Sequence, residues 1–264
     1  MNKKDINKII NILKNTYPDA KCSLDFSTPF ELVVAVMLSA QCTDERVNLT
    51  TPALFKKCRT IEDFANIDVN ELEDLIHPCG FYKNKAKNII KCANQILDNF
   101  NGKVPNNMED LISLPGIGRK SANVIMLEVF SNPQGIAVDT HCKRISNRLG
   151  LSSEKDPSKI EQDLLKQIDS KYYKDVNHLF IWHGRYTCKA RNPECNKCCI
   201  KNLCCRCHVY RRILTYFMSK FSGTYDTLSS LFFFILFITF SLKSFLFCIH
   251  LFIALFAFSI KSGM

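Results

Sequence analysis

Seven of the fourteen cysteines lie within twenty consecutive residues, and this group limits the possible folds more than any other feature of the sequence. They are Cys188, Cys195, Cys198, Cys199, Cys204, Cys205 and Cys207. The chain begins MNKKDINKII, without a signal-peptide pattern, so we expect a reducing cytoplasm. There, a tight cysteine group indicates a metal centre rather than disulfides.

Four of these cysteines have the spacing C-x6-C-x2-C-x5-C, at Cys188, Cys195, Cys198 and Cys204. Four thiolates within seventeen residues can converge on one compact inorganic centre. Zinc sites usually have two close pairs separated by a longer loop, whereas this set has only one close pair. The spacing therefore favours a [4Fe–4S] cluster. The adjacent pairs Cys198-Cys199 and Cys204-Cys205 leave the choice of ligands open.

The composition changes abruptly near residue 212. The first 212 residues hold 24 of the 25 acidic residues, whereas the last 52 hold 12 of the 20 phenylalanines. Two apolar runs, 231–242 and 245–260, are each shorter than the ~20 residues that span a bilayer, but together they could form one interrupted span. An integral membrane protein is therefore one alternative. We expect instead that 209–264 is an atypical, non-native tail from a frameshift, without membrane association.

The first 212 residues predict an all-α fold. Four isoleucines and leucines near the N-terminus recur at helical spacing, and Thr28-Pro29-Phe30-Glu31 has the pattern of a capping box with proline at the first helical position. The segment from Leu32 to Leu38 is apolar on all sides, which predicts a buried helix. Further helices are predicted over 84–100, 107–113, 119–130, 140–149, 158–168 and 175–186. No segment alternates convincingly with period two.

A glycine-containing hairpin, Leu114-Pro115-Gly116-Ile117-Gly118, connects two of these helices. Gly116 and Gly118 allow positive φ and a close approach of the backbone to a ligand. The N–H groups and the positive dipole end of the following helix then face whatever lies on the hairpin, which suits a DNA phosphate. The alternative is a tight turn that needs glycine and binds nothing.

Lys120 falls in the first turn of the helix after the hairpin. A cation there is disfavoured by a few tenths to about 1 kcal/mol, and partial burial would add to this; both favour the neutral amine that a Schiff-base nucleophile needs. Asp139 could stabilise positive charge on a sugar or help to deprotonate the amine. The alternatives are a lysine that pairs with phosphate or is solvated, and an aspartate that caps a helix. For Asp139 the two roles can coexist.

The net charge of +10 favours a polyanionic partner, although a solvated basic surface has the same composition. Lys189 and Arg191 lie in the six-residue loop between the first two cysteines of the set. They could contact phosphates or be solvated.

These motifs together resemble endonuclease III, a bifunctional DNA glycosylase and abasic-site lyase of the helix-hairpin-helix superfamily. The likeness rests on LPGIGRKSANV at 114–124, AVDTHCKRISNRLG at 137–150 and HGRYTCKARNPECNKCCIKNLC at 183–204. PFELVVAVMLSAQCTD at 29–44 and GFYKNKAKNI at 80–89 extend it over roughly residues 1–208.

The resemblance implies base-excision repair of double-stranded DNA that contains damaged bases or abasic sites. Oxidised pyrimidines would be removed, and the abasic site cleaved on its 3′ side by β-elimination through a Schiff base on Lys120, with Asp139 as the second catalytic residue. Gln41 would fill the gap left by the flipped base. Phe81 occupies the position where the family usually has a leucine wedge. The plain alternatives are a glutamine at a helix C-terminus and an ordinary surface aromatic.

The resemblance also implies two helical lobes with DNA across the cleft between them. A six-helix barrel with the helix-hairpin-helix motif (about 107–130) would span 22–132, and 1–21 with 133–208 would form the lobe whose four cysteines, Cys188, Cys195, Cys198 and Cys204, hold a [4Fe–4S] cluster. We expect a monomer, because one flipped base needs one active site. Two alternatives are a monofunctional adenine-mismatch glycosylase, which lacks the lysine, and a DNA-binding iron–sulfur module without catalysis.

Overall fold

The computed structural model describes residues 1–206. This part of the chain is all-α, as the sequence predicts, and contains no strand. None of its helices is long and apolar enough to cross a membrane. The atypical tail expected at 209–264, with its two apolar runs, and Cys207 lie outside the described residues.

The α-helices of residues 1–206 are α1 (Lys3–Thr16), α2 (Pro29–Leu38), α3 (Asp44–Lys57), α4 (Ile61–Asn66), α5 (Val69–Ile76), α6 (Tyr82–Phe100), α7 (Met108–Ser113), α8 (Arg119–Glu128), α9 (Thr140–Leu149), α10 (Pro157–Gln167) and α11 (Tyr173–Tyr186). The same residues contain short 3-10 helices at η1 (His77–Cys79), η2 (Ser170–Tyr172) and η3 (Cys195–Lys197). Each predicted helix is present.

Helices α3, α4 and α5 were not predicted from the sequence. Pro52 lies inside α3 and obscures its pattern, because proline is disfavoured in helix interiors. The other two helices are short, and α4 contributes a single buried residue, Phe64, to the core. Local periodicity is therefore weak in α3 and α4, whereas α5 has buried residues at helical spacing, Leu72 and Ile76, and was overlooked because it has only eight residues.

Helix α2 begins where its capping box predicts. The Thr28 side chain accepts a hydrogen bond from the Glu31 backbone N–H, and the Glu31 carboxylate accepts one from the Thr28 N–H. Pro29 occupies the first helical position. All residues from Leu32 to Leu38 are buried, which confirms the prediction of a central, fully enclosed helix.

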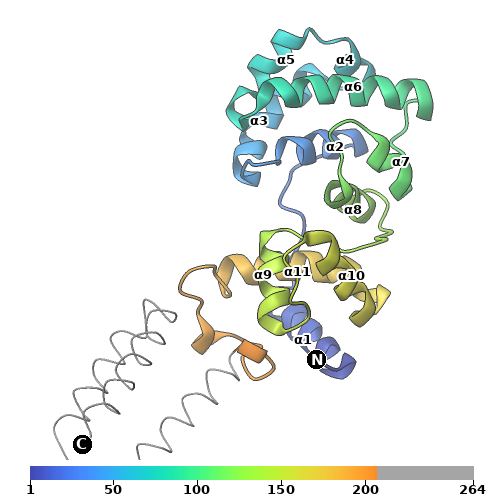
Figure 1. The fold of residues 1–264 in the computed structure, drawn as a ribbon. Helices are drawn as coiled ribbons and strands as arrows, with labels where there is room; N and C mark the ends of the chain where they lie inside the picture. Colours follow the sequence, from blue (N-terminus) through green and yellow to red (C-terminus); the bar gives the residue numbers. More distant parts are fainter. Residues whose placement is uncertain (207–264) are drawn as a thin grey trace, which may run out of the picture. The chain divides into compact units, whose positions relative to one another are not determined.

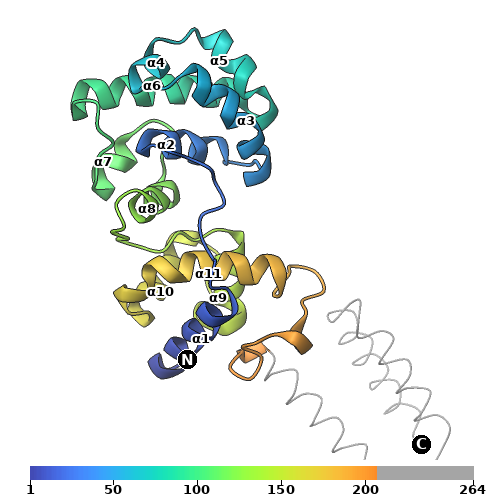
Figure 2. The same cartoon turned by 180° about the vertical axis from the view of Figure 1, so that it is seen from behind.

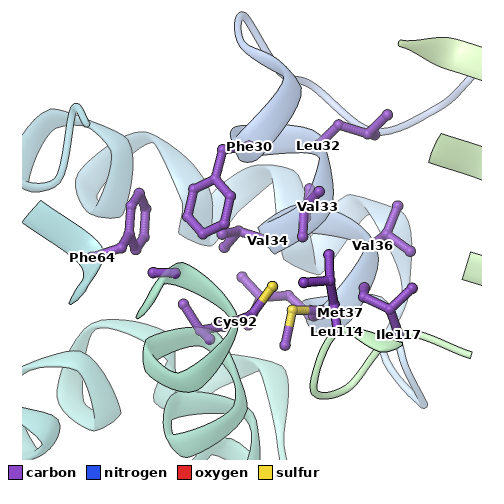
Figure 3. Close-up of a cluster of buried hydrophobic side chains, with 14 of the residues drawn as sticks. Phe30, Leu32, Val33, Val34, Val36, Met37, Phe64, Cys92, Leu114 and Ile117 are labelled. Carbon is purple, nitrogen blue, oxygen red and sulfur yellow. The ribbon is translucent and has the colours of Figure 1, made fainter. Parts of the chain in front are cut away.

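The first hydrophobic cluster surrounds α2 and receives side chains from α3 to α8. Figure 1 and Figure 2 show these helices grouped around α2 from opposite sides. In Figure 3 the rings of Phe30 and Phe64 lie side by side and pack edge to face, with their centroids 5.2 Å apart. Met37, Leu114 and Ile117 meet at the other end of the cluster. The hairpin is therefore anchored directly on α2.

The second hydrophobic cluster is formed by α1, α9, α10 and α11 together with Ile200. Helix α1 packs against α11, so the two ends of the described chain meet here (Figure 1). Three cysteines, Cys188, Cys198 and Cys204, pack against this cluster. The first cluster draws its buried residues from 24–126, and the second draws them from 6–13 and 136–200. The lobes implied by the resemblance, at 22–132 and at 1–21 with 133–208, stay a prediction.

Candidate active site and cysteine centre

The hairpin between α7 and α8 is a tight turn with two buried anchors. Leu114 and Ile117 are buried in the first cluster, and the Ile117 N–H donates to the Leu114 carbonyl at 3.1 Å. Gly116 has φ +82°, and a Cβ there would lie 2.7 Å from Cε of Met37. Both the backbone conformation and the packing on α2 therefore require glycine at this position.

Gly118 differs from Gly116 in both respects. It is the N-cap of α8 with extended backbone at φ −99°, so the positive φ that its sequence allows is not used. A Cβ at Gly118 would meet nothing within 4 Å. The N-terminus of α8 also has no side-chain cap. The open space and the uncapped helix terminus together fit the anion site that the sequence predicts.

Lys120 is the second residue of α8 and is exposed, so the partial burial that would favour a neutral amine is absent at this position. The helix begins at the molecular surface, and its buried residues lie further along, at Ala122, Asn123, Ile125 and Met126. Lys120 forms no ion pair with Asp139 within residues 1–206. Its exposed amine is therefore accessible to a substrate from outside the chain.

The first turn of α8 is tied to α10 by a buried carboxylate that the sequence analysis did not identify. Glu161 is 4% exposed and accepts from Arg119 Nε at 2.6 Å and from Asn123 Nδ2 at 2.8 Å. Arg119 immediately precedes Lys120. This network therefore fixes the backbone that carries Lys120 relative to the second cluster.

Asp139 is the N-cap of α9. Its Oδ1 accepts a hydrogen bond from the Cys142 N–H at 2.7 Å, which confirms the capping role predicted from the sequence. Asp139 is half-buried, and its carboxylate opposes the effect of burial on His141, whose pKa burial lowers. The carboxylate of Asp139 therefore affects the pKa of His141 while it caps α9.

Gln41 and Phe81 lie in two loops that share an unusual backbone. Their φ values are +54° and +49°, in the left-handed region that bulky residues rarely adopt. Gln41 lies beyond the end of α2 and is exposed, so its interpretation as a helix C-terminal glutamine is wrong. Phe81, directly before α6, is 66% exposed. Both side chains thus project from constrained backbone.

Lys85 connects these two loops, although the sequence analysis did not single it out. It is 7% exposed, and its Nζ donates to the Leu38 carbonyl at 2.8 Å and to the Cys79 carbonyl at 2.9 Å. The sequence signal for its burial was its position on the apolar face of α6, together with Ala86 and Ile89. A lysine at such a position usually extends to solvent, so periodicity alone would not have identified it.

Three of the four predicted cluster cysteines gather at one corner of the second cluster. Arg148 Nη1 donates to Cys188 Sγ at 3.1 Å, and Cys204 Sγ donates to the Arg148 carbonyl at 3.5 Å. Cys198 Sγ lies 3.7 Å from Nε2 of His183. The fourth, Cys195, is exposed at the start of η3.

The donor set at this corner suits a thiolate-bound centre, but the side chains do not enclose one. Within residues 1–206, no group of three or more His, Cys, Asp or Glu side chains is spaced to hold a metal ion. Cys199 and Cys205, the alternative members of the doublets, are exposed. Half-burial therefore favours Cys198 and Cys204 over their neighbours as ligands.

Two arginines of α9 hold the backbone of the cysteine loop, and neither was identified from the sequence. Arg148 donates to the carbonyls of Lys189 and Ala190 at 2.8 and 3.1 Å. Arg144 donates to the Cys188 carbonyl at 3.0 Å. These bonds satisfy carbonyls that a loop would otherwise leave to solvent, and they fix the loop on α9.

Of the two basic residues predicted to meet phosphates in this loop, one already has a partner. Lys189 Nζ lies 2.7 Å from the Glu194 carboxylate, with both side chains about half exposed. Arg191 is exposed. A phosphate contact by Lys189 would therefore have to replace a surface ion pair, which contributes little to stability.

Comparisons with known proteins agree with this architecture. Residues 34–170 match the family model HhH-GPD, described as a superfamily of base excision DNA repair proteins. Endonuclease III of Synechocystis sp. is 48% identical over 202 residues, which make up 76% of this chain and 92% of the relative. Endonuclease III of Escherichia coli is 41% identical over 204 residues, or 77% and 96% of the two chains.

Solved structures show the same relationship. A non-covalent endonuclease III–DNA complex matches with a TM-score of 0.75 and 41% identity over 80% of this chain and 99% of that chain. A trapped endonuclease III–DNA covalent intermediate matches with a TM-score of 0.75 and 40% identity over the same shares. The chain therefore belongs to the endonuclease III family, within the HhH-GPD superfamily of base excision DNA repair proteins.

Proposed function

We propose that this protein excises oxidised pyrimidines from double-stranded DNA and cleaves the resulting abasic site, with Lys120 as the nucleophile. The observation that carries the proposal is the exposed Lys120 in the first turn of α8, directly after the hairpin and beside an uncapped helix N-terminus. A covalent DNA intermediate has been trapped with a relative that is 40% identical. A covalent mechanism is therefore the natural one for this family member.

The reaction begins with a flipped nucleotide, because a base inside the duplex is out of reach. The neutral amine of Lys120 attacks C1′ of the sugar, and the bond from C1′ to the damaged base breaks with its electron pair going to the base. Opening of the sugar ring gives a Schiff base between Lys120 and C1′. Loss of a proton from C2′ then breaks the C3′–O bond and cuts the strand.

Asp139 assists at the start of this sequence. Its carboxylate stabilises the positive charge that develops at C1′ and helps to remove a proton from the Lys120 ammonium. One carboxylate oxygen accepts from the Cys142 N–H, which fixes the orientation of the group. Helix capping and charge stabilisation are therefore compatible in one residue.

DNA binding uses both loops and helix termini. Gln41 and Phe81 enter the duplex at the lesion, and their exposed, constrained positions support this role. A DNA phosphate binds at Gly116 and Gly118 against the N–H groups of α8, and Lys189 and Arg191 supply further phosphate contacts. The net charge of +10 strengthens binding in a salt-dependent manner.

We further propose that Cys188, Cys195, Cys198 and Cys204 hold a [4Fe–4S] cluster. The half-buried thiols of three of them at one corner, and the hydrogen bond from Arg148 to Cys188 Sγ, support this assignment. When bound, the cluster would cross-link the loop from Cys188 to Cys204. Iron and acid-labile sulfide analysis tests the assignment, with Cys199→Ser as the control for Cys198→Ser. A colourless, zinc-loaded and active protein would contradict it.

Borohydride trapping tests the nucleophile. The protein is mixed with a duplex that contains thymine glycol or one abasic site, beside Lys120→Gln and the control Lys159→Gln. Lys159 is a matched control because it is also exposed and in the first turn of a helix, but Asp156 caps that helix. We expect a covalent band with the parent and the control and none with Lys120→Gln.

Two outcomes of the trapping experiment would contradict the proposed mechanism. If folded parent protein binds the duplex and forms no covalent band, the lyase mechanism is wrong, and a monofunctional glycosylase or a DNA-binding module remains. If Lys120→Gln still forms the band at the parental rate, another amine is the nucleophile.

A further inference from the structure

Lys85 is a buried cation without a carboxylate partner in the described part of the chain. Its Nζ donates to two backbone carbonyls, of Leu38 and Cys79, at 2.8 and 2.9 Å, and it forms no ion pair within residues 1–206. Burial lowers the pKa of Lys85, whereas nearby Cys42 and Cys79 partly oppose this shift. The site therefore keeps an ammonium in surroundings that disfavour it.

Core packing alone does not explain a lysine here. Burying a charge costs more than burying an apolar chain of the same length. Methionine would fill nearly the same volume at this position on α6. Methionine could not donate the two hydrogen bonds to the Leu38 and Cys79 carbonyls. The role of Lys85 is therefore to hold the two backbone segments that carry these carbonyls.

The two acceptors precede the two loops proposed to enter DNA. Leu38 is the last residue of α2, three residues before Gln41, and Cys79 is the last residue of η1, two residues before Phe81. Gln41 and Phe81 both have positive φ. One ammonium thus bridges two constrained segments that are distant in the sequence.

We propose that Lys85 is a positioning residue that sets the spacing of the Gln41 and Phe81 loops, so that both side chains enter the duplex together. This inference rests on the proposed function of those two residues. A phenyl ring on a single methylene cannot extend to compensate for a displaced backbone, so the backbone at Phe81 determines how deeply the ring enters. Loop spacing then controls flipping of the nucleotide, not the reaction at C1′.

The test separates flipping from chemistry. Full-length parent, Lys85→Met and Lys85→Arg are compared, with Lys87→Met as the control, because Lys87 is an exposed lysine on the same helix. Single-turnover trapping is measured on a thymine glycol duplex, which requires flipping, and on single-stranded abasic DNA, which does not. Fluorescence of 2-aminopurine beside the lesion reports unstacking directly.

For Lys85→Met we expect a rate on the duplex that is lower by roughly tenfold or more, with a weaker aminopurine signal, and a rate on single-stranded DNA within about twofold of the parent. Lys85→Arg, which keeps N–H donors, should recover part of the duplex rate. Lys87→Met should match the parent on both substrates.

Two results would overturn the proposal: an unchanged duplex rate and aminopurine signal in Lys85→Met, or equal losses on both substrates. If Lys85→Met does not fold, Lys85→Gln is compared in the same way. Failure of the proposed function is distinguishable, because the parent would then form no covalent band with either substrate. The aminopurine signal would still test the positioning role.

Discussion

Replacing Arg119 by methionine leaves the Glu161 carboxylate buried with Asn123 as its remaining hydrogen-bond donor. The Glu161 side chain is 5% exposed, whereas that of Arg119 is 49% exposed. The arginine can therefore return to water after loss of its partner, but the carboxylate cannot. Removing one partner of a buried ion pair costs about 3–5 kcal/mol. We expect Arg119→Met to lower the free energy of unfolding by about 3 kcal/mol, the low end of this range, because half of the arginine side chain is already exposed to solvent.

Glu161→Gln should cost less, although it removes the more buried member of the pair. A glutamine oxygen can still accept from Asn123 Nδ2, and the released Arg119 is solvated. The loss is then the short hydrogen bond from Arg119 Nε and the longer one, at 3.4 Å, from Arg119 Nη2. A charged hydrogen bond is worth about 1.5–3 kcal/mol before a discount for the exposure of Arg119. We therefore expect Glu161→Gln to lower the free energy of unfolding by about 1 kcal/mol. The prediction is that Arg119→Met loses more stability than Glu161→Gln.

Urea unfolding of the full-length variants, followed by far-UV circular dichroism, measures both free energies. The double variant Arg119→Met/Glu161→Leu should recover most of the loss, because apolar side chains can replace a buried pair at little cost. A smaller loss for Arg119→Met than for Glu161→Gln would refute this reasoning.

Four further outcomes are expected. Asp139→Asn keeps the N-cap, since asparagine caps as well as aspartate, but should lower the trapping rate by about tenfold or more if the charge stabilises C1′; unchanged trapping would leave capping as its only role. Gly116→Ala should cost over about 1 kcal/mol in urea unfolding, whereas Gly118→Ala should mainly weaken duplex binding in fluorescence anisotropy. Burial raises the pKa of Cys142 from 9.0 to about 12. The buried thiol therefore contributes its full stability below pH 9.0, and this contribution is lost as the pH rises toward about 12. Rapid alkylation of Cys142 in the native protein at neutral pH, detected by peptide mass, would contradict its burial. Deleting residues 209–264 should leave trapping within about twofold of the full chain, because the residues proposed for catalysis and DNA binding all lie within residues 1–206; a marked loss would assign the tail a role.

The sequence alone was sufficient where the determining interactions are local. The capping box at Thr28 and Glu31 and the hairpin at 114–118 each lie within a short segment, so their structure follows from local spacing. The helical class follows from periodicity in the same way. Helices α4 and α7 each have six residues and one buried side chain, and only α7, next to the recognised hairpin, was predicted, because so short a segment carries little periodicity of its own.

The tertiary structure was needed wherever a residue acts through a distant partner. Lys85 and Glu161 occupy ordinary positions in α6 and α10, and only packing shows that both are buried with specific partners. In the hairpin, Gly116 and Gly118 look equivalent in sequence. Only the structure shows that Gly116 has φ +82° and lies against Met37 of α2, while Gly118 faces open space. Long-range contacts decide these roles because burial is a property of the assembled fold and not of the local chain.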